Sequence, residues 1–176
     1  MKKFLPKLFK GTSGFTLIEL LVALTIVTIL AVAVYVALNP AQRLKDSKDA
    51  RRTADIESIL TAIHQSIVDN KGTYPTNMPA DGTVRQIGTG NATDCPVSVG
   101  TDCNTTDITG YATVCADLMA GGQNLSNYLA SIPLDPLGGS TANAVKTGYA
   151  VGKTSVGIVT VYACHTDGTS VIKVSR

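Results

Sequence analysis

The chain has 176 residues, 44% of them hydrophobic, with 15 Lys and Arg against 13 Asp and Glu, a formal net charge of +2. Bulk charge this close to neutral gives no support to nucleic-acid binding, which a strongly basic domain would indicate. The sequence contains no Gly-rich phosphate loop, no nucleophile elbow and no paired acids in a His-bearing motif, so we do not expect an enzyme.

The first feature in chain order is an apolar segment at 15–38, preceded by a short basic leader at 1–14. A helix over this segment would be about 36 Å long, enough to cross a hydrocarbon core of roughly 30 Å. The leader holds four Lys, with no acid before Glu19, which predicts a cytoplasmic N-terminus and an exported remainder. A secretory signal peptide is the alternative, with an A-x-A triplet at 31–33, but its apolar run would normally be shorter.

Glu19 is the one charged residue within 15–38. A carboxylate there costs about 2.5–3.5 kcal/mol on insertion scales, so it needs a partner. The string GFTLIE at 14–19, following a basic leader, resembles the processing site of type IV prepilins and of the pseudopilins of type II secretion. The resemblance implies that a membrane peptidase cuts after Gly14, that Phe15 becomes the N-methylated first residue, and that Glu19 serves in assembly. An ammonium at Phe15 would neutralise the Glu19 carboxylate of an adjacent subunit.

Residues 39–72 are predicted to continue the helix in amphipathic form. Pro40 should kink or loosen it, because proline lacks a donor and clashes with the preceding turn. Apolar residues recur at steps of three and four between Leu44 and Ile67, and Gly72 suits a left-handed cap.

A basic cluster lies early in this second helix. It suggests a contact with lipid headgroups or with DNA. We interpret it as a solvated face, because acids are interspersed and two pairs, Lys45–Asp49 and Arg51–Asp55, have the spacing of i,i+4 ion pairs. The cluster consists of Arg43, Lys45, Lys48, Arg51 and Arg52.

Residues 73–176 are predicted to form an exported globular head. It opens on a Gly-x-Tyr-Pro sequence at 72–75, which also resembles the pilin family. The region 76–116 is rich in Thr, Gly, Asp and Asn and is expected to be a loop. An exported head favours disulfides, and four cysteines allow three pairings. We favour Cys95–Cys103 as a short local loop and Cys115–Cys164 as a link to the C-terminal sheet; zinc is the rival, although the sequence has no C-x-x-C pair.

A short helix is expected around 124–130, followed by two prolines that bracket Asp135 and predict a rigid turn. This turn resembles the I/L-P-x-D-P-x-G loop of pseudopilins and many type IV pilins. In the major pseudopilins a calcium ion binds in the loops that follow, which makes Asp135 and Asp167 candidate calcium ligands. They are few for an all-protein oxygen site, so we expect no cofactor, with calcium as the alternative.

The segment 148–175 is predicted to be a three-stranded antiparallel meander, with a hairpin loop at 165–169 centred on Asp-Gly. The expected fold is therefore α+β. A long N-terminal helix, half membrane and half amphipathic, packs against a small C-terminal antiparallel sheet, as in pilins.

The functional hypothesis is a structural subunit of a type IV pilus-like surface filament, used in adhesion, motility or DNA uptake. Its expected partners are further copies of itself, a prepilin peptidase, an inner-membrane assembly platform and the membrane. Removal of the leader leaves 11 basic against 13 acidic side chains, a formal charge of −2, so the basic precursor says little about nucleic acid. The alternatives are a type II secretion pseudopilin, or a minor tip subunit that binds DNA or a surface. We expect a single-pass precursor in the cytoplasmic membrane and an extracellular fibre after assembly.

Overall fold

A computed structural model describes residues 14–90, 95, 103, 108, 110, 112, 114–136, 142–168 and 170–176. The predicted leader, apart from Gly14, and much of the predicted loop region therefore lie outside the described residues, as does one residue of the hairpin loop. The chain is an α+β protein that forms two compact units, Met1–Arg43 and Leu44–Arg176.

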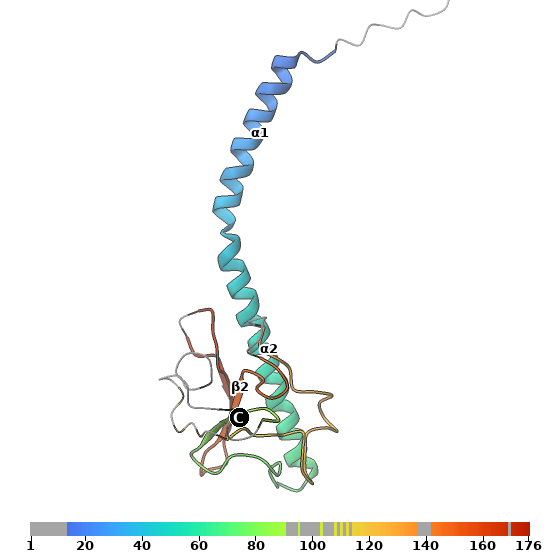
Figure 1. The fold of residues 1–176 in the computed structure, drawn as a ribbon, viewed down its shortest axis with the longest axis vertical. Coiled ribbons are helices and arrows are strands. Elements are labelled where there is room, and N and C mark those ends of the chain that lie inside the picture. The colour runs from blue at the N-terminus through green and yellow to red at the C-terminus, as the bar shows by residue number, and fades with distance from the viewer. Residues whose placement is uncertain are drawn as a thin grey trace, which may run out of the picture. The chain divides into compact units, whose positions relative to one another are not determined.

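The first unit is built on α1, Leu17–Leu38, drawn as a helical ribbon in Figure 1. All 22 of its residues are exposed. α1 ends at Asn39, which adopts a left-handed conformation with φ of 41° and donates its N–H to the Val36 carbonyl. Pro40 is the first residue of α2, Pro40–Asp69, where its missing N–H would have no partner in any case. The helix is thus interrupted at the position of the expected kink.

The core of the second unit is the apolar face of α2 packed against a sheet. Ile56, Ile59, Leu60 and Ile63 follow the three- and four-residue spacing of the sequence, and each is at most 1% exposed. α2 ends as predicted, because Gly72 has a φ of 88° and donates its N–H to the Ile67 carbonyl at 2.8 Å.

The sheet has four antiparallel strands in the order β1-β2-β3-β4, and Figure 1 shows β2 beside α2. The predicted C-terminal meander is confirmed. The loop prediction is wrong at β1, which pairs Val84 with Gly152 and Gln86 with Ala150; a strand of three residues is too short to show a periodic pattern. The strands are β1 Val84–Gln86, β2 Tyr149–Lys153, β3 Val159–Ala163 and β4 Lys173–Ser175.

Both faces of this sheet are covered. Tyr149 and Val151 belong to the α2 cluster, whereas Ala150 between them belongs to a second cluster with Cys103 and Cys164. Alternate residues of a strand point to opposite faces, so β2 is buried on both sides. The sequence predicted cover by the long helix on one face; loop residues supply the other.

The helix predicted around 124–130 is a single turn instead, so that prediction is wrong. The Leu125 carbonyl accepts the N–H groups of Tyr128 and Leu129, both at 2.9 Å, and no helix is assigned there. The Asn124 side chain competes locally, since its Oδ1 accepts the Ser126 N–H at 3.0 Å.

Candidate functional site

The start of α1 is closed by a capping box that contains Glu19. Thr16 is the N-cap residue, and its Oγ1 accepts the Glu19 N–H at 3.3 Å. In return Oε2 of Glu19 accepts the Thr16 N–H at 3.0 Å and the Thr16 hydroxyl at 2.8 Å. The exchange satisfies two donors that a helix start otherwise leaves without partners. Glu19 is thus the third residue of the helix, held by local bonds.

This geometry leaves one carboxylate oxygen available beside Phe15. Both side-chain bonds go to Oε2, and within the described part of the chain no bond to Oε1 is found. Thr16, which holds Oε2, directly follows Phe15, a residue with 85% exposure. Gly14 is equally open, because a Cβ built there would meet nothing within 4 Å. The Gly14–Phe15 bond and the free oxygen of Glu19 are therefore both accessible.

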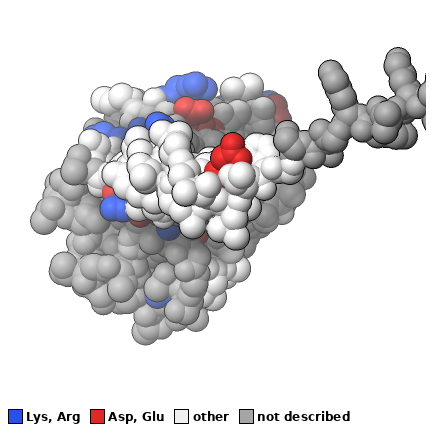
Figure 2. Space-filling model, turned by 90° about the horizontal axis from the view of Figure 1, so that it is seen from above, with Lys and Arg blue, Asp and Glu red and all other residues white. Residues whose placement is uncertain are grey.

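The rest of α1 is an apolar surface with its polar groups satisfied internally. Thr25 and Thr28 donate their hydroxyls to the carbonyls of Val22 and Thr25, each at 2.8 Å. Figure 2, a view from above, shows a surface of mostly uncharged residues, drawn in white, toward the viewer, with the red of acidic side chains on it. By length and composition, one helical stretch of the described residues, within Leu17–Asp69, is apolar enough to cross a membrane. An apolar surface of this size needs lipid or other protein to cover it.

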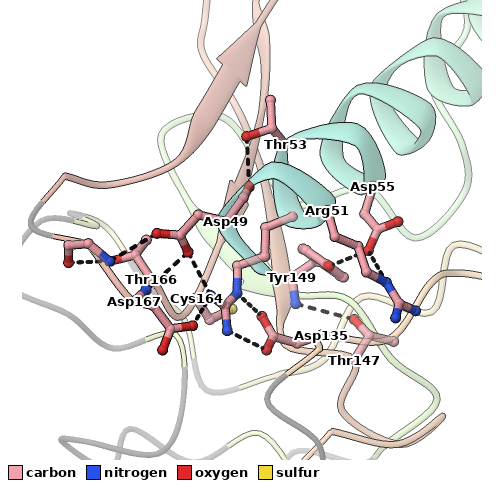
Figure 3. A network of polar contacts seen from close by, with 12 residues as sticks. Asp49, Arg51, Thr53, Asp55, Asp135, Thr147, Tyr149, Cys164, Thr166 and Asp167 are labelled. Carbon is pink, nitrogen blue, oxygen red and sulfur yellow. Dashed lines mark hydrogen bonds and ion pairs between the residues drawn. The ribbon is translucent and has the colours of Figure 1, made fainter. Parts of the chain in front are cut away.

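A second polar site lies in the other unit, around the guanidinium of Arg52. Asp135 receives two bonds from it, at 2.9 Å from Nε and 3.0 Å from Nη2. Nη1 donates to Asp49 at 2.6 Å and to Asp167 at 2.7 Å. The Arg52 and Asp135 side chains are fully buried. The three carboxylates labelled in Figure 3, Asp49, Asp135 and Asp167, come from α2, from the Pro-Asp-Pro turn and from the C-terminal hairpin loop, and dashed lines mark their bonds to the guanidinium.

The charges in this network stabilise one another. Burial works against the charge of Arg52, but its bonds to Asp135, Asp167 and Asp49 raise the pKa of the guanidinium above its ordinary value. Burial raises the pKa of Asp49, but the N–H of Asp167, the guanidinium and the N–H of Gly168 outweigh it and lower that pKa below its ordinary value. The two N–H groups lie 3.0 and 2.9 Å from the carboxylate. The network thus fastens three separate segments together.

The sequence interpretation placed Arg52 on a solvated face, and this is wrong because the side chain is fully buried. The burial of Arg52 could have been predicted from its spacing relative to the apolar residues of α2. Arg52 precedes Ile56, Ile59 and Ile63 by four, seven and eleven residues, so it continues the apolar face of α2. The calcium candidates Asp135 and Asp167 do come together, but both bind this guanidinium.

The expected disulfide pairing is also wrong. The structure joins Cys95 to Cys115 and Cys103 to Cys164, with Cα atoms 5.5 and 4.3 Å apart. Short sequence separation favoured a Cys95–Cys103 loop, but packing against the sheet brings Cys103 to Cys164 instead. Cys103 and Cys164 lie in the same buried cluster against Ala150, on the face away from α2. Pairing across that cluster staples the loop region to the sheet.

Comparison with known proteins bears on the first of these sites. No curated protein and no solved structure matches the chain. The family model for the prokaryotic N-terminal methylation motif matches residues 9–35, which contain Gly14, Phe15, the capping box and most of α1. This chain therefore carries the N-terminal signature of type IV pilins and pseudopilins.

Proposed function

We propose that this protein is a structural subunit of a type IV pilus-like surface filament, cleaved after Gly14 by a prepilin peptidase and polymerised through α1. The observation that carries the proposal is the start of α1. The capping box holds the Glu19 carboxylate beside Phe15 with Oε1 available. Cleavage would turn the Phe15 nitrogen into an ammonium. That group on one subunit can pair with Glu19 of the next, while apolar helix surfaces pack together.

The two disulfides support the expected topology. Disulfides persist in oxidising compartments, so they favour an exported position for the unit Leu44–Arg176. The precursor would then sit in the cytoplasmic membrane with its leader inside the cell.

We further propose that the head needs no calcium, because the Arg52 guanidinium already supplies a cation to Asp135 and Asp167. A major pseudopilin with calcium in these loops is the contrasting case.

Mass analysis of the mature N-terminus, together with electron microscopy of sheared cell surfaces, tests the filament proposal. We expect a chain that begins at methylated Phe15 and forms long fibres. Gly14→Val should leave uncut precursor in the membrane, because a Cβ at residue 14 meets no described atom within 4 Å, so the change is aimed at peptidase recognition and not at the folded chain. Normal maturation of Gly14→Val, or a mature protein that stays monomeric, would overturn the proposal. A short periplasmic polymer would instead identify a pseudopilin.

A further inference from the structure

Three cations form a stripe along one side of α2. Lys45, Lys48 and Arg51 follow one another at steps of three, so their side chains are neighbours on the helix surface. Lys45 is exposed, Lys48 is half-buried and the Arg51 side chain is 62% exposed. Like charges at this spacing repel one another, so an anion bound beside the stripe would stabilise it.

The acids with the right spacing to neutralise the stripe are engaged elsewhere. Asp49, four residues after Lys45, is held by Arg52 at 2.6 Å and by two backbone N–H groups. Within the described residues Lys45 forms no ion pair, so the expected Lys45–Asp49 pair is not found, and Lys48 forms none either.

Asp55, four residues after Arg51, also has another partner. It accepts the buried Tyr149 hydroxyl at 2.6 Å, while its contact with Arg51 is longer, at 3.8 Å. Asp49 is thus held by Arg52, and Asp55 is shared between Tyr149 and Arg51, so Lys45 and Lys48 keep their positive charge without an ion pair among the described residues.

The stripe also begins close in sequence to the end of the apolar helix. Lys45 is the seventh residue after Leu38. Even a fully extended chain of that length spans at most about 25 Å, and a helical one about 10 Å. If α1 crosses a bilayer, Lys45 therefore lies in or near the headgroup layer at which α1 ends. Anionic lipids are abundant charges at such a surface.

We propose that Lys45, Lys48 and Arg51 bind the phosphate groups of anionic lipids on the side of the membrane where the head emerges. The proposal rests on the membrane-anchored precursor of the proposed function. Lipid headgroups diffuse freely, so they can match the spacing of the three cations without a fixed complementary surface. Bound lipid would hold the start of α2 at the headgroup layer until the subunit is extracted into a fibre.

The test is native mass spectrometry of the full chain, purified in detergent and mixed with equal amounts of phosphatidylglycerol and phosphatidylcholine. We expect preferential retention of phosphatidylglycerol that weakens as salt is raised. Each cation removed should reduce the preference by about fivefold at low salt. The test variant replaces all three residues with Gln. A control with the same charge change replaces three exposed cations elsewhere, Lys71, Lys173 and Arg176.

Loss of the preference in the stripe variant, with retention in the control variant, would support the proposal. Equal retention of both lipids by the unchanged chain, or equal behaviour of the two variants, would overturn it. A stripe variant that keeps the lipid preference but yields few fibres would show a contact between subunits instead, which also overturns it. If the chain proves uncut and monomeric yet keeps the preference, the filament proposal fails and this one stands.

Discussion

Glu19 has one observed role and one proposed role, and a single substitution can separate them. Its side chain closes the capping box with Thr16, and we propose that its negative charge pairs with the ammonium of an adjacent subunit. A capping box works with either Glu or Gln at this position, whereas pairing with an ammonium requires the charge. Substitutions of Glu19 therefore test the assembly hypothesis most directly.

Glu19→Gln and Glu19→Ala form a matched pair for this purpose. We expect both precursors to be cleaved and both to give few fibres, because neither offers a charge to the neighbouring ammonium. Glu19→Ala also loses its half of the capping box, the bonds from Oε2 to the Thr16 N–H and hydroxyl. Fibre yield can be quantified by immunoblotting of sheared filaments. Ordinary yield from Glu19→Gln would show that the cap, and not the charge, is what assembly needs.

At the scale of elements, Arg52 connects α2 to two segments that are distant in sequence. Its partners Asp135 and Asp167 follow it by 83 and 115 residues. Removing one member of a buried ion pair leaves an uncompensated charge, and for Asp135 that charge is fully buried.

We expect Arg52→Met to lower the free energy of unfolding by about 3–5 kcal/mol. Arg51→Met is the control, since it makes the same change one residue away on an exposed side chain and should cost less than about 1 kcal/mol. Thermal unfolding of the full chain followed by circular dichroism measures both.

Calcium chloride added to the unchanged protein should leave its Tm where it was. A clear rise would contradict the proposal that the head needs no calcium.

Most of the elements could be predicted from sequence because their patterns are long. The apolar run gives α1, the three- and four-residue spacing gives α2, and the β-branched segments give the C-terminal meander. β1 could not be predicted, because three residues carry no period and the strand forms only by pairing with β2. The turn at 124–130 looked helical, but so short a helix lacks enough bonds to offset nucleation.

The sites divide in the same way. Gly14, Phe15 and Glu19 stand close together within the matched motif at 9–35, so their roles can be predicted from sequence alone, and those roles stay predictions. The Arg52 network joins four residues from three segments, and only the folded chain brings them together. The disulfide pairing depends equally on tertiary structure, because Cys103 meets Cys164 across 61 residues on the face of the sheet that α2 does not cover.

At the scale of the whole molecule, the ion-pair network around Arg52 predicts how the free energy of unfolding depends on pH. The pKa of Asp49 is lowered from its ordinary 3.8 in the folded state. A carboxyl group of this kind stabilises the fold fully above its unfolded pKa, and the contribution is lost as pH falls through the lower folded pKa. The sensitive range therefore begins near pH 4 and extends below it.

We expect the urea midpoint of unfolding to fall in that range, and to fall less steeply in Asp49→Asn, which should also be less stable at neutral pH. The control is Glu57→Gln, an exposed acid on the same helix, which should leave the curve unchanged. If Asp49→Asn follows the same acid profile as the unchanged chain, Asp49 does not contribute to it.

The Cys103–Cys164 bond also sets an order of events during biosynthesis. Ribosomes make Cys103 before Cys164, which follows it by 61 residues. This disulfide therefore cannot close until the chain has been made through Cys164 and both cysteines have reached the oxidant. A subunit stalled before that point would lack the bond, which distinguishes it chemically from a finished one.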